Sequence, residues 1–320
     1  MTTPRSRTLL AVAGLTGLIG LIGLTAGCGG TSGSNAGPEE TTTSTSSTTT
    51  TAPRPESDQS PPRSTFGLAF DERRIWVADF YGGQVIAVDP ETGEVVKRYK
   101  VEDGVPEGVE DLTVGPDGSL FWTGFNDGQV GRMTPAAVSS VVAGLPSGAG
   151  PIAFSKDGKL YVGRAVIGDG LWETDPNAEK KPRKISDKIG NVNAFAVGSD
   201  GAIYGPRFGL GTEGALVRID TGSGEVTEIA KGFDAPVAVK LSPDQKTAYV
   251  LSQVPGGTPK VSAVDLGTRQ VRDHANALTP LVENMTVAPD GRIFVSSFNE
   301  PVLTVIATDG TTKKLTLGQR

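Results

Sequence analysis

Three oxygen-bearing side chains occupy equivalent positions in a repeated segment, and their chemistry suits a hard metal ion. Glu110, Asn193 and Glu283 each precede, by seven residues, an aspartate that opens a tight turn. Two carboxylates and an amide oxygen brought to one point would suit Ca²⁺, with water completing about six to eight ligands. Asp111, beside Glu110, could then act as a general base. The plainer alternative is that both glutamates are solvated at the mouth of a channel, because an oxygen cluster is not a specific motif.

A second set of polar side chains follows the second strand of the repeated segments. Arg164 and Arg207 belong to adjacent segments that lack a carboxylate at the first position, so two guanidinium groups facing a cation would suit an anionic ligand. Alternatively, each arginine pairs with a nearby acid, such as Asp169 or Glu213. The complete set of candidate ligand-binding residues is Asp79, Asn126, Arg164, Arg207 and Asn299.

The residue inventory excludes the common forms of nucleophilic catalysis. The chain has one histidine and one cysteine, so no Ser-His or Cys-His pair of ordinary type can be assembled. His274 lies late in its repeat, where the outer strand is expected, far from the ring of carboxylates. A metal-dependent hydrolysis needs no histidine and stays open.

These positions recur because the chain repeats a unit of strand, turn and strand six times between Phe66 and Arg320. Residues 110–127 and 283–300, the two most similar copies, are identical at nine of eighteen aligned positions. Four of the turns contain Asp-Gly, which predicts a two-residue hairpin with positive φ. The turn aspartates recur every 40 to 46 residues, at Asp71, Asp117, Asp157, Asp200, Asp244 and Asp290.

Each repeat is expected to contain four strands, because two more strand-like runs follow each pair. Four strands in about 40–45 residues is the period of a β-propeller blade. Leucine-rich and helical repeats are excluded by the missing leucine spacing and by the absence of an amphipathic helical pattern. The sequence predicts an all-β fold, a six-bladed β-propeller over residues 65–320. Blade six would own all four strands, which favours closure of the ring by packing.

The propeller geometry explains why the polar positions matter. The innermost strands line a central channel, so the residues that begin them converge on the axis. Glu110, Asn193 and Glu283 would come from blades two, four and six, and Phe66 would stand at the same position in blade one. The loops that leave the second strands open on the same face, and the Asp-Gly turns lie on the opposite face.

The first 27 residues predict a lipoprotein signal peptide. Arg5 and Arg7 form a basic start, residues 9–24 are apolar, and residues 24–28 read Leu-Thr-Ala-Gly-Cys, similar to a lipobox. Acylation of Cys28 would hold the protein at the extracytoplasmic face of the cell membrane. The alternative is an uncleaved membrane anchor, for which the apolar run is shorter than the about 20 residues that a span needs.

Residues 28–64 predict a disordered stalk. Positions 41–51 are all threonine or serine, and prolines recur at 53, 55, 61 and 62. Such a segment buries too little apolar surface to fold. The formal net charge is −6, and no basic cluster interleaved with aromatic residues occurs, so no nucleic-acid partner is expected.

The blade segments resemble a known group of propellers. Residues 150–163, GPIAFSKDGKLYVG, and 283–299, ENMTVAPDGRIFVSSFN, are similar to the blade signature of the regucalcin/gluconolactonase and strictosidine-synthase-like families, which NHL repeats share. In the lactonases, a Glu, an Asn and an Asp at inner-strand starts hold a divalent metal. The resemblance implies these roles for Glu110, Asn193 and Glu283. The chain departs from the family pattern at Phe66, where the family has a glutamate, and its acidic residues lie in different blades.

Two functions follow as hypotheses. The first is a lipid-anchored propeller that binds a small ligand, a glycan or an extracytoplasmic protein on one face, with an axial Ca²⁺. The second is a Ca²⁺-dependent hydrolase of lactones or similar esters, with Asp111 or Glu110 as general base. The first is favoured, because resemblance in fold does not transfer chemistry.

Overall fold

The computed structural model describes residues 58–320 except 72, 209–212, 255–256 and 319–320. These residues lie within one compact unit, Ser57–Arg320. The expected signal peptide, Cys28 and most of the expected stalk lie outside the described residues. Within the described part of the chain, no helix is long and apolar enough to cross a membrane.

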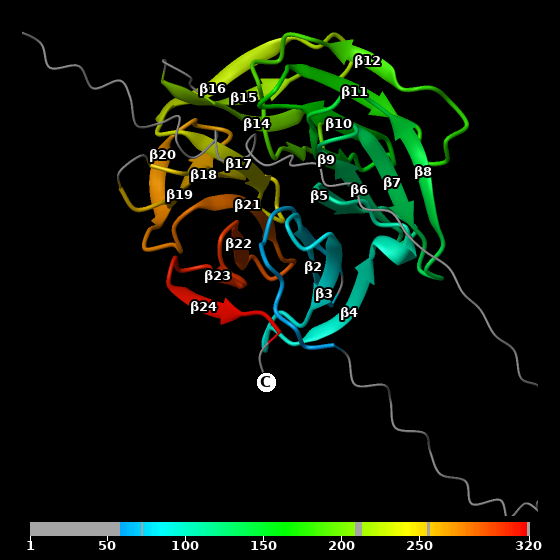
Figure 1. Cartoon of the computed structure of the whole chain (residues 1–320). Coiled ribbons are helices and arrows are strands. Elements are labelled where there is room, and N and C mark those ends of the chain that lie inside the picture. Colours follow the sequence, from blue (N-terminus) through cyan, green and yellow to red (C-terminus); the bar gives the residue numbers. More distant parts are fainter. Residues whose placement is uncertain (1–57, 72, 209–212, 255–256, 319–320) are drawn as a thin grey trace, which may run out of the picture. The chain divides into compact units, whose positions relative to one another are not determined.

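Six four-stranded antiparallel sheets follow one another along the chain, and the six-bladed propeller is confirmed (Figure 1). The first three blades are β1 (Leu68–Phe70), β2 (Ile75–Asp79), β3 (Gln84–Val88) and β4 (Val95–Lys100); β5 (Val109–Val114), β6 (Leu120–Gly124), β7 (Gln129–Met133) and β8 (Ser139–Gly144); and β9 (Ala149–Phe154), β10 (Leu160–Arg164), β11 (Gly170–Thr174) and β12 (Arg183–Ser186). The last three are β13 (Ala196–Val197), β14 (Ile203–Arg207), β15 (Gly214–Ile219) and β16 (Val226–Phe233); β17 (Pro236–Leu241), β18 (Thr247–Ser252), β19 (Lys260–Asp265) and β20 (Val271–Ala275); and β21 (Val282–Val287), β22 (Ile293–Ser297), β23 (Val302–Ile306) and β24 (Thr312–Thr316). One short 3-10 helix, η2 (Val101–Asp103), follows β4.

In the four blades whose turn contains Asp-Gly, the hairpin between the first two strands has a three-residue loop, so the prediction of a two-residue loop was wrong. In blade two, Gly115 N donates to Ser119 O, and Gly118 N donates to Gly115 O. Only the glycine of the Asp-Gly pair has positive φ, at 77° for Gly118. This is a type I turn closed by a left-handed residue, for which Asp-Gly is equally suitable. In blade five, Gln245 takes the left-handed position with φ of 61°.

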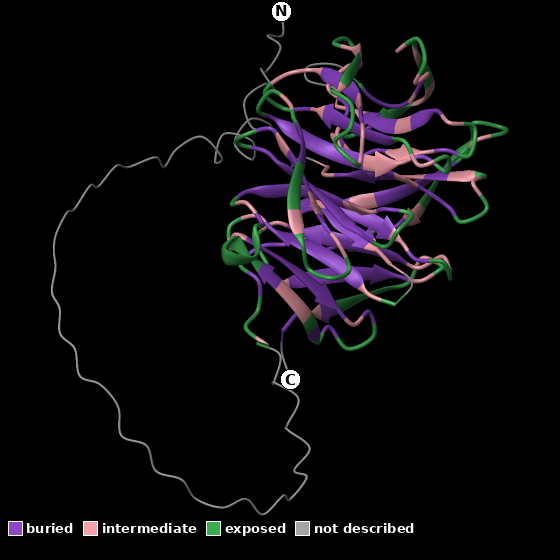
Figure 2. Cartoon of the chain, turned by 90° about the vertical axis from the view of Figure 1, so that its right-hand side faces the viewer, coloured by how far each residue is buried: buried purple, intermediate pink, exposed green. Residues whose placement is uncertain are grey.

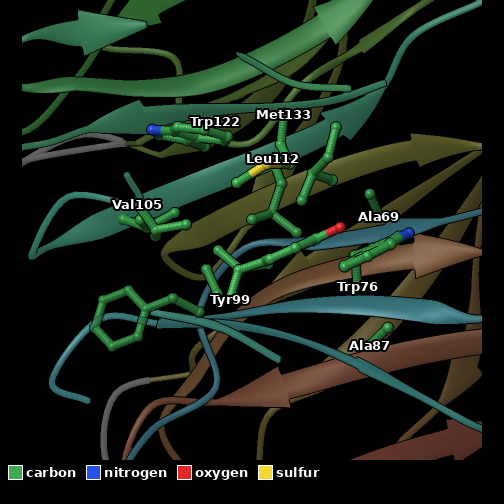
Figure 3. Packing of buried hydrophobic residues seen from close by; sticks show 13 residues of the cluster. Ala69, Trp76, Ala87, Tyr99, Val105, Leu112, Trp122 and Met133 are labelled. Atoms are coloured by element: carbon green, nitrogen blue, oxygen red, sulfur yellow. The ribbon is translucent and has the colours of Figure 1, made fainter. Parts of the chain in front are cut away.

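The hydrophobic core lies between blades rather than within them. Among the described residues, each of the six hydrophobic clusters combines side chains of neighbouring blades. Between blades one and two, Trp76 stacks on Tyr99 with ring centroids 5.9 Å apart, and Trp122 and Met133 pack in the same cluster (Figure 3). The middle strands β2, β6 and β22 are therefore buried along their whole length, while outer strands such as β4 and β20 face solvent (Figure 2).

The ring closes by packing of blade one on blade six, as the four strands of blade six predicted. Side chains from both blades, including Leu68 and Phe294, form one buried cluster. A buried polar clamp accompanies it: Thr65 Oγ1 donates to Ser297 O at 2.7 Å and accepts from Ser297 N at 2.8 Å. The clamp ties the segment just before β1 to blade six.

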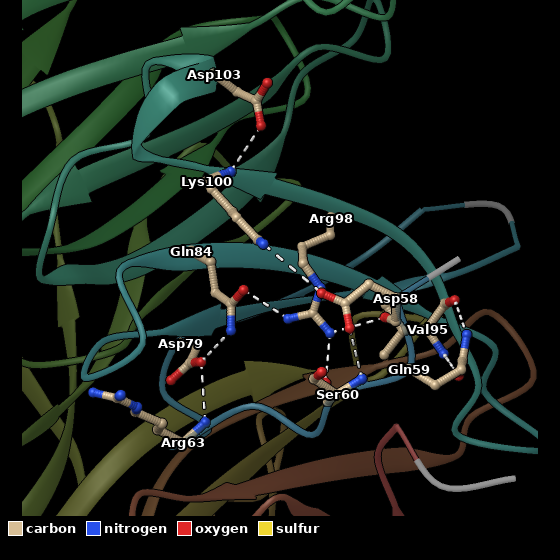
Figure 4. A network of polar contacts seen from close by, with 10 residues as sticks. All are labelled: Asp58, Gln59, Ser60, Arg63, Asp79, Gln84, Val95, Arg98, Lys100 and Asp103. Atoms are coloured by element: carbon tan, nitrogen blue, oxygen red, sulfur yellow. Dashed lines mark hydrogen bonds and ion pairs between the residues drawn. The ribbon is translucent and has the colours of Figure 1, made fainter. Parts of the chain in front are cut away.

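Residues 58–64, the described part of the expected stalk, lie against blade one. The buried Asp79 accepts hydrogen bonds from the backbone amides of Arg63 and Ser64, at 3.0 and 2.9 Å, and from Gln84 Nε2 at 2.7 Å (Figure 4). Arg98 Nη2 donates to Ser60 O at 2.5 Å. The described residues before 65 thus pack on blade one, and Asp79 serves to fix this segment.

We predict that Thr65→Val lowers the free energy of unfolding by roughly 2–4 kcal/mol, because the isosteric valine leaves the buried Ser297 amide and carbonyl unpaired. Urea unfolding measures the change. Thr227→Val, at an exposed position of β16, is the matched control and should change stability little. Equal stability of the two variants would contradict a role for the Thr65 clamp in closing the ring.

Candidate functional site

The inner strands bring one residue from each blade to the same level of the axis. The hairpin hydrogen bonds place Asp71, Gly115, Ser155, Gly198, Ser242 and Ala288 at equivalent positions. Counting five residues back from each gives the upper ring, Phe66, Glu110, Gly150, Asn193, Val237 and Glu283. We call the face at which these residues begin the inner strands the upper face, and the face of the hairpin turns the lower face.

The side chains of Glu110, Asn193 and Glu283 come together above Gly150. A Cβ atom at Gly150 would lie 3.9 Å from Glu110 Oε1 and 3.8 Å from Asn193 Oδ1. The side chain of Asn193 also forms a hydrogen bond with Glu283. Glycine at position 150 therefore leaves open the space into which the two predicted oxygen ligands point.

The two glutamates have strongly perturbed proton affinities. Burial and the nearby charges of Glu283 and Asp111 raise the pKa of Glu110 well above its usual range. Burial and the charge of Asp111 raise the pKa of Glu283 to about 7, against the opposing effect of its hydrogen bond with Asn193. Glu110 Oε2 is buried and has no hydrogen-bond partner in the described structure. A shared proton or a cation is needed to stabilise both groups together.

Asp111 points to the axis as well, one level below Glu110. Consecutive residues of a regular strand face opposite sides, but the pairing of β5 with β6 is shifted between Val109 and Leu112. This bulge turns both acidic side chains inward. Asp111 Oδ1 accepts from Asn284 Nδ2 at 2.9 Å and Asp111 Oδ2 accepts from Ile152 N at 3.3 Å, so this carboxylate joins blades two, three and six.

Blade one requires a glycine where the hydrogen bond between Asp111 and Asn284 passes it. A Cβ atom on Gly67 would lie 2.4 Å from the Cα of Asp111 and 2.7 Å from its Oδ1. Burial raises the pKa of Asp111 to about 6, while Lys240 and the three hydrogen bonds lower it.

Comparison with known proteins agrees with this architecture. The sequence model described as SMP-30/Gluconolactonase/LRE-like region matches residues 105–319, which is more than half of the chain. The chain belongs to this family. The match spans blades two to six, and blade one lies outside it. No curated protein is significantly similar to the chain in sequence.

Solved structures share the fold at low identity. Virginiamycin B lyase from Staphylococcus aureus has a TM-score of 0.57 and 14% identity, covering 81% of this chain and 86% of that one. A putative gluconolactonase has a TM-score of 0.57 and 12% identity, with 81% and 92% covered. A chain of a nidogen/laminin complex reaches 0.62 at 8% identity, with 79% and 91% covered. Identities this low show the propeller fold alone.

In this SMP-30/gluconolactonase-type propeller, the candidate ligand-binding residues that follow the second strands differ in burial and in hydrogen-bond partners. Asp79 is fully buried and bound to residues 63, 64, 82 and 84, so its carboxylate is not open to solvent. Arg207 pairs with Glu228, and Arg164 Nε donates to Ser147 O at 2.7 Å. The alternative in which an arginine pairs with a local acid therefore holds for Arg207, though with an acid different from those considered. Asn126 and Asn299 are exposed.

An aromatic wall, of which the sequence analysis named only Phe66, stands beside the carboxylates. We give this name to Phe66, Phe80, Tyr81, Phe125 and Phe298, which form a chain of ring contacts at the upper face. Tyr81 is 46% exposed. Burial, together with the charges of Glu283 and Glu110, raises the pKa of its hydroxyl, so this ring lies near both glutamates. In the sequence, the run Phe80-Tyr81-Gly82-Gly83 after β2 was the feature from which aromatic side chains at this face could have been predicted.

A bound cation would have to be held by carboxylate and amide oxygens together. Among the described residues, no group of three or more His, Cys, Asp and Glu side chains is arranged to hold a metal ion. The donors that fit are two carboxylates and the Asn193 amide oxygen, all hard oxygen ligands. The unpartnered Glu110 Oε2 supplies one ready donor.

We predict that, without divalent cations, the free energy of unfolding falls as the pH rises from about 4.5 to about 7. The folded state holds protons on Glu283, Glu110 and Asp111 that the unfolded state has already released, so deprotonation destabilises the fold. The loss should be roughly 1–3 kcal/mol. Glu283→Gln should reduce this loss, and Glu225→Gln, at an exposed position, should not. Chemical unfolding across this pH range measures it, and stability that rises over the window in the wild type would contradict the buried pair.

Proposed function

We propose that this propeller binds a divalent cation, Ca²⁺ first of all, between Glu110, Asn193 and Glu283, and that the surrounding upper face binds a small ligand, a glycan or a protein partner. The observation that carries the proposal is the buried, unpartnered Glu110 Oε2 beside the half-buried carboxylate of Glu283. Leaving such an atom without a partner is costly in an ordinary protein interior.

The chemistry of the donors supports Ca²⁺ over softer metals. Carboxylate and amide oxygens are the ligands that Ca²⁺ takes, whereas zinc and copper sites draw on histidine and cysteine. When bound, the cation would offset the repulsion between the two carboxylates and offer open positions to oxygen atoms of a ligand. Asn193 would orient Glu283 through their hydrogen bond. The aromatic wall would supply an apolar surface beside the ion.

A second candidate is metal-dependent hydrolysis of a lactone or ester. Membership of a family described by gluconolactonase favours it. Asp111, the general base expected from the sequence, is poorly placed for this role, because both of its carboxylate oxygens accept hydrogen bonds below the upper ring. Glu283, with a pKa of about 7, is better suited to take a proton near neutral pH.

We further propose that the protein is a lipoprotein of the extracytoplasmic membrane face. The basic start, the apolar run and the sequence Leu-Thr-Ala-Gly-Cys around Cys28 support this. A stalk rich in Thr, Ser and Pro would hold the propeller away from the bilayer. The binding face would then be presented to extracytoplasmic ligands.

We predict that Ca²⁺ binds the purified protein saturably, in the micromolar range, and that Glu110→Gln/Glu283→Gln abolishes this binding. The double variant keeps the size and hydrogen-bonding capacity of both side chains but removes both charges. Isothermal titration calorimetry measures the binding. The matched control is Glu102→Gln/Glu225→Gln, two exposed glutamates.

The same proteins separate the two candidate functions. Ca²⁺ binding without turnover of a panel of five- and six-membered lactones would support a binding protein. Ca²⁺-dependent turnover that is lost in Glu283→Gln would favour the hydrolase. Equal Ca²⁺ binding by the wild type and the Glu110/Glu283 variant would overturn the axial site.

We predict that Cys28→Ala abolishes incorporation of labelled palmitate in a bacterial host. The thioether-linked diacylglycerol and the amide-linked acyl chain would both be attached to this cysteine at the processed terminus. Incorporation of palmitate by neither the wild type nor the variant would indicate an uncleaved anchor instead.

A further inference from the structure

The axis carries a second space, separate from the carboxylate pair and open at the lower face. Its volume is about 280 Å³. The residues that line it are the final positions of the inner strands, next to the hairpin turns, such as Phe70, Val114, Phe154 and Val197. We call this space the lower chamber.

One charged side chain lines the lower chamber, that of Lys240 on β17. The equivalent residues of the other blades are small, namely Ala69, Thr113, Ala153, Ala196 and Thr286. A long cationic side chain in one blade of six is therefore accommodated by short side chains in the other five. The lining is otherwise apolar apart from two threonine hydroxyls.

The hydrogen-bonding capacity of these polar groups is largely unused. Lys240 Nζ donates to Phe195 O at 3.2 Å and forms no ion pair with any described residue, although it interacts electrostatically with Asp111. An ammonium group has three donors, so two remain. Within the described structure, the hydroxyls of Thr113 and Thr286 also form no hydrogen bond with the protein.

We propose that the lower chamber binds a small organic monocarboxylate, with its carboxylate on Lys240 and the threonine hydroxyls and its apolar body against the chamber wall. A cation in low-dielectric surroundings attracts an anion strongly, and the donors outnumber the protein acceptors available to them. The volume lies near the lower limit for ligand pockets, about 300 Å³, which suits a body of the size of one ring.

The charge of the surroundings selects a monoanion. Among the described residues, Lys240 is the only cation of the chamber wall, and Asp111 lies near it on the side of the upper ring. A second negative charge on the ligand would face Asp111 with no further cation to balance it. A neutral amide of the same shape would lack the charge-assisted hydrogen bond. This site neither uses nor requires the proposed Ca²⁺ site, so the two proposals can fail independently.

The experiment is calorimetric titration of the purified full-length protein with benzoate, benzamide and phthalate. Benzoate should bind, while benzamide and phthalate, with no charge and with two charges, should bind at least about 10-fold more weakly. Lys240→Met keeps the length of the side chain and should weaken benzoate binding at least about 10-fold. Lys246→Met, an exposed lysine of the same blade, should leave it unchanged.

A second variant tests the chamber without removing the charge. Ala153→Leu fills the space while retaining Lys240, and it should abolish benzoate binding even if Lys240→Met proves unstable. Circular dichroism establishes that each variant is folded. The proposal is overturned if the wild type does not bind benzoate, if benzamide binds equally well, or if a folded Lys240→Met or Ala153→Leu variant binds as the wild type does.

Discussion

The constraint on which the whole structure depends is the convergence of six inner strands on one axis. A blade cannot bury its apolar faces alone, so every blade packs between two neighbours and the ring has to close. At the centre, strands from different blades then approach to within contact distance, as the 2.4 Å separation of a Cβ on Gly67 from the Asp111 Cα shows. At the level of Lys240, the residues of the other five blades are small. Any large or charged residue on the axis therefore needs a specific reason to be present.

The axial charges are costly for the fold, which is why we propose that they serve a ligand. Glu110, Asp111 and Glu283 are three acidic groups near one lysine, and burial raises the pKa of each carboxylate. Asp111 is compensated by three hydrogen-bond donors and by Lys240, which explains a structural role for it. The two glutamates have no comparable compensation, and Glu110 Oε2 has no partner at all among the described residues. Local rules of stability are broken at functional sites, and this pair breaks them where the compensated Asp111 does not.

The sequence was sufficient for the fold and for the ring of first positions, because both follow from counting along a repeat. The seven-residue spacing before the turn aspartates found Glu110, Asn193 and Glu283, and the structure brings them together. The sequence could not reveal that a bulge turns Asp111 inward, since a bulge depends on pairing between strands rather than on residue type. The burial of Asp79 was equally hidden, because its partners lie in a segment whose composition indicated disorder. Lys240 could have been found from the sequence. Blade five has this lysine four residues before its turn aspartate, whereas the other five blades have uncharged residues there, namely Gly67, Thr113, Ala153, Ala196 and Thr286.

The contacts that close the ring also set the geometry of the site. Glu110 and Glu283 belong to blades two and six, so blade one lies between them and its position sets their separation. Blade one is held from three sides: the Thr65 clamp joins it to blade six, the Asp79 hydrogen bonds tie down residues 63 and 64, and the Asp111–Asn284 bond spans it at Gly67. Two repelling carboxylates would push their blades apart if the intervening blade could yield. The polar contacts of blade one therefore oppose that repulsion, and they keep both glutamates near enough to share a single cation or proton.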